Sequence, residues 1–352
     1  MNEHARGPLD ALKSIMKRQY IWGIVAIALL LLINVIKDPT YLAISVGHNG
    51  HLVGNGIDIL RSAAPVMMIA VGMCLVVATK GIDLSVGSLM AVAGAVAMEF
   101  LRSAPNTPGA AFAALGLVIV VTGALGAING ILVSVVGLQP FISTLVLMLA
   151  GRGLAKVITG GQNTSASNDL FRWFANGYVF GVPVVFVLAL AIVIIVGLVV
   201  RRSALGLMIE AIGMDPKAAR LAGINRRALL LTVYIAGGVL AGFAGVFATA
   251  TVMTVDVSRT GYLLELDAIL AVVIGGTSLA GGKFNITGAA IGAVLIATLD
   301  KTVVFLGVSS SASPAFKAIV IVALVLLQSE RVRRMFRQRR AARPAKREVV
   351  AA

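Results

Sequence analysis

Long apolar runs, separated by short polar segments, alternate along nearly the whole chain. A helix needs about 20 apolar residues to cross the hydrocarbon core of a bilayer, and most of the runs approach that length. The first run follows basic residues, as in a signal peptide, but no small-residue cleavage site comes after it, so we expect a retained helix. The predicted spans cover residues 20–36, 63–79, 82–101, 110–136, 138–158, 179–200, 228–252, 266–281, 285–308 and 314–328. The pattern therefore predicts an all-α polytopic membrane protein with about ten transmembrane helices.

Two of these runs, 266–281 and 314–328, are short and interrupted by polar residues. Such half-spans are typical of broken helices that are buried in protein, so eight long spans are the alternative count. Glycines four residues apart predict close contacts between helix backbones inside the bundle. These pairs are Gly126/Gly130, Gly238/Gly242 and Gly288/Gly292.

Basic residues gather in three polar segments: before the first run, between residues 201 and 227, and after residue 330. Six predicted spans separate the first segment from the second, and four separate the second from the third. Both numbers are even, so all three basic segments lie on one side, and the positive-inside bias predicts that this side is the cytoplasm. We therefore expect a cytoplasmic segment at 1–19, a membrane domain at 20–328 with a cytoplasmic loop at 201–227, and a basic cytoplasmic tail at 329–352.

The composition agrees with this pattern. Apolar residues make up 59% of the 352-residue chain and charged residues only 13%, which excludes a water-soluble enzyme and a disordered chain. The net charge of +15 comes largely from the segments that flank the spans, so membrane topology explains it without nucleic acid. The single cysteine, Cys74, excludes an intrachain disulfide and a cysteine-based zinc site.

Polar side chains inside apolar runs are functional candidates, because a charge at a helix centre costs about 2.5–3.5 kcal/mol on insertion scales. Asp83 and Ser85 suit either the capping of a helix start or contact with a solute. Asn129 suits either a hydrogen bond between helices or contact with a solute. Amides, hydroxyls and an aromatic face would bind a neutral polyol. The predicted solute pathway comprises Asp83, Ser85, Asn129, Gln139, Phe141, Ser143, Thr144 and Asp267.

Asp267 opens a short, glycine-rich run much as Asp83 does in the first half of the chain. This recurrence suggests an internal duplication with inverted topology, an arrangement found in other carriers.

The loop at 201–227 contains one short predicted helix, from about Pro216 to Leu221. Asp215 suits its N-cap, Pro216 its first turn, and Gly223 its C-terminal stop. A small helix with an Ala218–Ala219 face on the cytoplasmic side has the shape of a docking element, and an ordinary connector is the alternative.

Three segments carry a resemblance to a known family. The sequences GIDLSVGS (81–88), AIGMDPKAARLAGIN (211–225) and ELDAILAVVIGGTSLAGGKFNITGAAIGA (265–293) are similar to segments of ribose-type monosaccharide permeases of bacterial ABC importers. The sequences at 50–65 and 138–162 resemble most closely the galactofuranose permeases of that family. Lys80 stands where the family often has glycine, and it is placed to pair with Asp83. The resemblance covers residues 50–328.

The resemblance implies an ABC-importer permease fold in the bacterial inner membrane, with both termini cytoplasmic. It implies three kinds of partner: an ATPase subunit, a periplasmic sugar-binding protein, and a second permease chain, with a homologous heterodimer favoured over a homodimer. It also implies that the loop docks on the ATPase through Glu210, Ala211, Gly213, Ala218, Ala219 and Gly223. The implied function is import of a monosaccharide, galactofuranose-like or related, by alternating access.

We expect no enzymatic activity, cofactor or metal in this chain. The stretch 275–283 is only superficially similar to a phosphate-binding loop, because five residues, not four, separate Gly276 from Gly282, and Phe284 replaces the Ser/Thr. ATP hydrolysis therefore falls to the partner subunit. The alternatives are an ABC permease for branched-chain amino acids or nucleosides, and an ion-coupled sugar carrier, which would need ionisable groups deep in its spans.

Overall fold

The computed structural model describes residues 20–47, 51–309 and 312–328, so the predicted segments 1–19 and 329–352 lie outside the described residues. Within the described ranges, eight helices are long and apolar enough to cross a membrane. They are α2 (Tyr20–Lys37), α3 (Asn55–Ala78), α4 (Val86–Ser103), α5 (Pro108–Ile131) with its π-helical continuation η1 (Leu132–Val136), α6 (Pro140–Ile158), α8 (Val184–Arg202), α11 (Arg226–Val252) and α13 (Ile286–Phe305). The prediction of an all-α polytopic membrane protein is confirmed.

The two short runs form helices that are shorter than the other eight. They are α12 (Leu264–Ile274), with 11 residues, and α14 (Ser313–Gln328), with 16. The prediction extended the α12 run to residue 281, but the helix ends at Ile274. Gly276, Gly281 and Gly282 adopt positive φ, which breaks the helix and forms a loop. The described chain therefore matches the alternative count of eight long spans.

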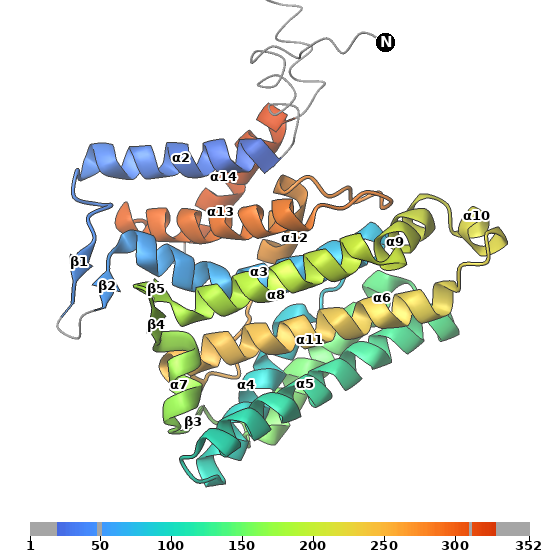
Figure 1. Ribbon diagram of the computed structural model, residues 1–352, viewed down its shortest axis with the longest axis horizontal. Coiled ribbons are helices and arrows are strands. Elements are labelled where there is room, and N and C mark those ends of the chain that lie inside the picture. Colours follow the sequence, from blue (N-terminus) through green and yellow to red (C-terminus); the bar gives the residue numbers. More distant parts are fainter. Residues whose placement is uncertain (1–19, 48–50, 310–311, 329–352) are drawn as a thin grey trace, which may run out of the picture.

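Short elements collect at the two ends of the bundle (Figure 1). At one end lie α9 (Ala204–Met214) and α10 (Pro216–Leu221). The other end carries α7 (Asp169–Asn176) and three antiparallel strand pairs: β1 (Ser45–Val46) with β2 (Leu52–Val53), β3 (Thr164–Ser165) with β6 (Thr254–Val255), and β4 (Tyr178–Val179) with β5 (Val182–Pro183). We call these the α9–α10 end and the hairpin end.

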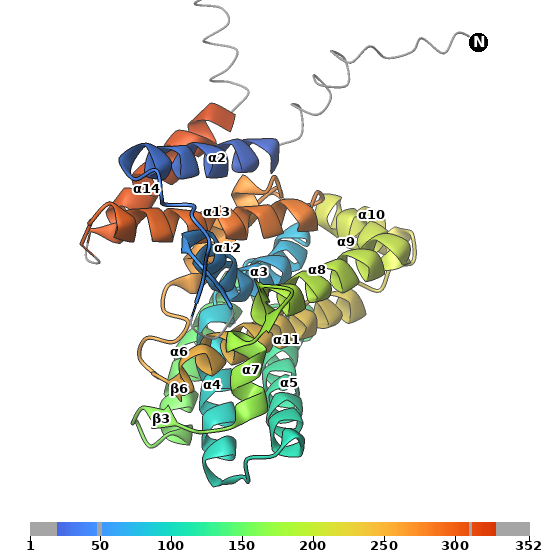
Figure 2. The ribbon, with the colours of Figure 1, turned by 60° about the vertical axis from the view of Figure 1, so that its left-hand side comes forward.

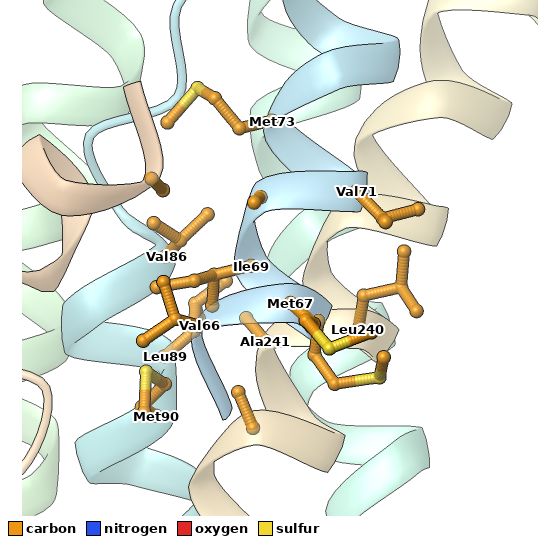
Figure 3. Packing of buried hydrophobic residues seen from close by; sticks show 14 of the residues in the cluster. Val66, Met67, Ile69, Val71, Met73, Val86, Leu89, Met90, Leu240 and Ala241 are labelled. Atoms are coloured by element: carbon orange, nitrogen blue, oxygen red, sulfur yellow. The ribbon is translucent and has the colours of Figure 1, made fainter. Parts of the chain in front are cut away.

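Helices α3, α4, α11 and α13 form the interior, whereas α2, α5, α6 and α8 expose most of their apolar surface. Figure 3 shows Met67 and Ile69 of α3 lying between side chains of α4 and α11, including Leu89 and Leu240. Lipid offers no hydrophobic drive for helix association, so this tight packing, and not removal from water, holds the interior helices together.

Glycine allows the closest of these helix contacts. A Cβ atom on Gly126 of α5 would collide with the Tyr234 carbonyl of α11, and one on Gly238 would collide with the Thr122 carbonyl of α5. In the same way, a Cβ atom on Gly288 of α13 would collide with the Gly275 carbonyl just after α12. The prediction that the glycine pairs serve helix packing is confirmed at these positions.

Candidate functional site

The turn before α4 is closed by an acidic side chain. Asp83 Oδ1 accepts hydrogen bonds from the backbone N–H of Ser85 at 2.9 Å and from its hydroxyl at 2.5 Å. The α4 helix begins one residue later, at Val86. Asp83 therefore closes the turn that leads into α4, but it caps none of the helix's own N–H groups, because both of its hydrogen bonds go to Ser85, which precedes the helix.

A hydrogen-bonded network continues from this turn across two further helices. Asn129 Nδ2 of α5 donates to Ser85 Oγ at 3.0 Å, and Ser143 Oγ of α6 donates to Asn129 Oδ1 at 3.0 Å. Asp83, Ser85, Asn129 and Ser143 are all at most 1% exposed. We call these four residues the Asp83 network. Each member hydrogen-bonds to another member, and Asn129 bonds to one residue on each side, which matches the alternative that Asn129 joins helices.

The predicted solute pathway also includes three other residues in α6 or just before it, of which one is buried and two are exposed. Thr144 is buried beside the Asp83 network, where its hydroxyl lies 3.1 Å from the Ile82 carbonyl and 2.9 Å from the Pro140 carbonyl. Gln139 and Phe141 are exposed, Phe141 by 52%. The structure therefore brings five of the predicted pathway residues together and places these two on the outer surface of α6.

The loop at 201–227 forms the predicted short helix with the predicted boundaries, but the prediction of a single helix is wrong, because α9 occupies Ala204–Met214 of the same loop. The Asp215 carboxylate accepts from the backbone N–H groups of Lys217 and Ala218, and Pro216 occupies the first turn of α10. Gly223 adopts a φ of 82° after the helix, and the N–H of Ile224 returns to the Ala219 carbonyl. This local chemistry fixes α10 at the tip of the α9–α10 end.

Backbone contacts connect α9 to the interior. A Cβ atom on Gly213 would collide with the Ala78 carbonyl at the end of α3 and with the backbone nitrogen of Gly282. Gly282 N–H itself donates to the Ala78 carbonyl at 2.9 Å. We call Ala78, Gly213 and Gly282 the backbone junction. It joins α3, α9 and the loop after α12. Its first member, Ala78, precedes Asp83 by five residues in the chain.

Lys80 takes part beside this junction instead of pairing with Asp83. Its ammonium donates to the Met214 carbonyl at 3.2 Å, and within the described ranges Lys80 and Asp83 form no ion pair. The predicted pairing of these two residues is therefore wrong, because Lys80 adopts a φ of 65° and its side chain extends toward the end of α9.

The predicted coupling residues occupy different environments. Gly213 and Ala219 are buried, Glu210 and Ala211 are half-buried, and Ala218 and Gly223 are exposed. The outer surface of α9–α10 also carries Leu221 and Met214, exposed by 91% and 65%. Sequence reasoning missed these two, although an apolar residue in a basic loop is a signal for a protein contact.

Asp267 is not a member of the Asp83 network and lies in the first turn of α12. Lys317 of α14 donates to its carboxylate at 3.1 Å and also pairs with Asp300 of α13 at 2.6 Å. These three residues, which we call the charge triad, border a cavity of about 520 Å³. Sequence reasoning missed Asp300 and Lys317, although a charge within an apolar run is itself a signal.

Nothing in the described residues gathers three His, Cys, Asp or Glu side chains in a way that could hold a metal ion. Cys74 is buried in α3, where its sulfur lies 3.3 Å from the Thr277 hydroxyl. What the arrangement offers is a mechanical connection: a protruding helix pair joined through backbone contacts to a buried polar network, with a charged cavity elsewhere in the bundle.

Comparison with known proteins agrees with this arrangement. Residues 55–328 match the family described as "Branched-chain amino acid transport system / permease component". The chain is 50% identical over 325 residues to a fructose import permease protein of Bifidobacterium longum, covering 91% of this chain and 90% of the relative. It is 39% identical over 321 residues to a galactofuranose transporter permease protein of Escherichia coli, covering 90% and 92%.

A ribose import permease protein of Escherichia coli is also 39% identical, over 310 residues that cover 87% of this chain and 92% of the relative. No solved structure matches the chain. The bundle and the matches together define a multi-pass permease subunit of an ABC importer. The chain belongs to the permease family matched over residues 55–328, among its ribose-type members.

Proposed function

We propose that this chain forms part of the membrane pathway of an ATP-driven importer that carries a monosaccharide across the bacterial inner membrane. The fructose, galactofuranose and ribose permeases among its relatives support this choice of solute, since each aligns with about nine-tenths of the chain. A galactofuranose-like or related sugar remains the predicted substrate. The chain binds no cofactor in this proposal, and ATP is used by a separate ATPase subunit.

The single observation that carries the coupling proposal is the backbone junction. Helices α9 and α10 protrude from the bundle, yet Gly213 rests on the backbone of Ala78 and Gly282. Main-chain atoms in contact cannot move aside as flexible side chains do. A displacement of α9 and α10 is therefore transmitted almost fully to the end of α3 and to the loop after α12.

An ATPase can drive transport only if it contacts the inward-open and outward-open states differently. In this proposal the ATPase seats on α10 and on the exposed Met214 and Leu221. Nucleotide-driven movement of the ATPase shifts α9, and the junction passes the shift to the turn that holds Asp83. The Asp83 network then moves α4, α5 and α6 together, which alternates access to the pathway.

We further propose that two permease chains form the complete pathway, with a homologous heterodimer favoured over a homodimer, and that a periplasmic sugar-binding protein delivers the solute to the hairpin end. The α9–α10 end then faces the cytoplasm, as do both termini. The clustering of Arg201, Arg202, Arg220, Arg226 and Arg227 at this end supports that orientation.

The coupling proposal is tested by placing a charge on α10. Ala218→Glu changes an exposed position, so we expect normal insertion but loss of ATPase co-purification and of ATP-driven uptake. Ala219→Glu changes a side chain that is only 4% exposed, so we expect a lower yield of folded protein. Phe180→Ser is the control for ATPase co-purification, because Phe180 is a fully exposed apolar residue at the hairpin end, away from α10. Uptake by Ala218→Glu at the unaltered rate would contradict the docking assignment.

A branched-chain amino acid is the second candidate solute, favoured by the description of the matched family. The two candidates are separated by competition: unlabelled fructose, ribose and galactose, or unlabelled leucine and valine, are added to uptake assays of the whole transporter. We expect competition from a sugar and none from the amino acids.

A further inference from the structure

Helices α12, α13 and α14 pack against one another (Figure 2). The cavity beside the charge triad is lined by residues of these three helices and of the segment just before α12. Its volume, about 520 Å³, falls in the range of about 300–1,000 Å³ that is usual for small-molecule sites. The lining consists of one aromatic ring, two carboxylates, one ammonium and a set of apolar side chains. The residues that matter for recognition are Tyr262, Asp267, Asp300 and Lys317.

Neighbouring contacts place this cavity toward the hairpin end. Asp300 lies near the end of α13, and the next residue, Lys301, pairs at 2.7 Å with Asp58 in the first turn of α3. The opposite end of α3, at Ala78, belongs to the backbone junction. The cavity is therefore on the side of the bundle away from α9 and α10, where solute would enter under the proposed orientation.

The charge triad is not saturated. Two carboxylates share one ammonium, so the three groups carry a formal charge of −1, and a carboxylate offers about four lone-pair positions. The Asp300 side chain is 43% exposed, whereas those of Asp267 and Lys317 are 13% and 17% exposed. Asp300 Oδ1 is used by Lys317, and Oδ2 makes no hydrogen bond within the part of the chain that the structure describes. This oxygen is an available acceptor that borders the cavity.

Tyr262 supplies a complementary surface. Its side chain is 64% exposed and lies on the cavity's edge, just before α12. A sugar ring presents hydroxyl donors around its rim and C–H groups on its faces. Carboxylate acceptors suit the former, and an aromatic ring suits the latter. The fixed ammonium of Lys317 adds a donor for hydroxyl oxygens and prevents the carboxylates from repelling each other.

The Asp83 network offers none of these features, because its side chains are at most 1% exposed and bond to one another. We infer that the cavity between α12 and α14 is a receiving site for a neutral monosaccharide, held by hydrogen bonds to Asp300 and the rest of the charge triad and by contact with Tyr262. This inference rests on the proposed function and assigns the solute to a specific place on the chain.

The test uses thiol protection in the whole transporter, since the only cysteine, Cys74, is buried. Ala318→Cys places a thiol on the cavity wall. Its rate of labelling by a maleimide added from the hairpin side is measured with and without fructose, ribose or galactose. Mass action predicts about tenfold slower labelling at a sugar concentration ten times Kd. Ser258→Cys is the control, because Ser258 is exposed before α12 but lies outside the cavity lining.

Protection of Ala318→Cys by a sugar, with no change at Ser258→Cys, supports the site. Protection of neither position, equal slowing of both, or protection by sodium chloride alone would overturn it. A second variant removes the available acceptor: Asp300→Asn should raise the sugar concentration for half-protection about tenfold, because hydrogen bonds to a charged group are stronger than those between neutral groups. Lys301→Met changes the adjacent ion pair, which faces α3, and should leave that concentration unchanged.

Sugar uptake by the unmodified transporter separates the two proposals. Normal sugar uptake without sugar protection at Ala318→Cys overturns the receiving site and leaves the proposed function standing. Uptake of amino acids without uptake of any sugar overturns the proposed function itself.

Discussion

At the scale of single residues, buried polar side chains join the helices of this permease. Asn129 uses its amide nitrogen toward Ser85 and its amide oxygen toward Ser143, so one side chain joins the turn before α4, the helix α5 and the helix α6. In a lipid environment no water replaces a lost partner, so removal of Asn129 would take from the Ser143 hydroxyl its acceptor and from the Ser85 hydroxyl one of its two hydrogen bonds.

Asn129→Leu should therefore lower the stability of the folded protein by about 1–3 kcal/mol, the range for leaving buried polar groups unsatisfied. The measurement is thermal unfolding of the purified complex in detergent, together with sugar uptake. Thr122→Val is the matched control: Thr122 is equally buried in α5, but its hydroxyl bonds only to the Val118 carbonyl of its own helix. If Asn129→Leu proved as stable as the control and only uptake fell, the side chain would contact the solute instead of joining helices.

At the scale of elements, the relation between α3, α9 and the loop after α12 is set by backbone contact. Alanine favours a helix over glycine by about 0.8–1 kcal/mol, so Gly→Ala in a helix normally stabilises or is neutral. Gly213 lies inside α9, yet a Cβ atom there would collide with Ala78 and Gly282.

Gly213→Ala should thus reverse the usual effect and lower stability by about 1–3 kcal/mol, as overpacking does, and it should reduce ATP-driven uptake more than ATPase binding. The control is Gly116→Ala in α5, where an added Cβ meets nothing within 4 Å. Stability and uptake are measured for both variants. Equal results for the two would show that the backbone junction does not constrain α9.

At the scale of the whole molecule, the two ends of the bundle should face opposite sides of the membrane. Reporter fusions at residues 18, 215 and 335 should all be active in the cytoplasm. A fusion at residue 180, between β4 and β5 at the hairpin end, should be active only outside it. If the fusions at residues 180 and 215 were active on the same side of the membrane, the proposed orientation would be contradicted.

Eight of the ten predicted runs form the long helices, and the other two form the shorter helices α12 and α14. The α12 helix starts beside the first turn of α4, where Gly261 and Glu265 lie against Gly87, and its following loop reaches the backbone junction at Gly282. Helix and loop together therefore run inside the bundle from α4 to this junction. A segment of this kind avoids exposing unpaired backbone to lipid because α3 and α13 pack against α12. The predicted inverted repeat and domain boundaries stay predictions.

The amino-acid sequence by itself determined the class of protein, the approximate positions of the eight long helices within its ten predicted spans, the boundaries of α10 and its Asp215 cap. Each of these follows from local chemistry: runs of apolar residues, a capping carboxylate and a proline at a first turn. The family resemblance to ribose-type permeases likewise rested on local motifs and is confirmed by the comparisons.

Only the tertiary structure decided which polar residues meet. It joined Asp83, Ser85, Asn129 and Ser143 in one buried network and left Gln139 and Phe141 outside it. It also placed Asp267 with Asp300 and Lys317, and directed Lys80 to Met214. The physical reason is that a partner for a buried charge or amide comes from another helix, and the rotation and crossing of helices depend on packing over the whole bundle.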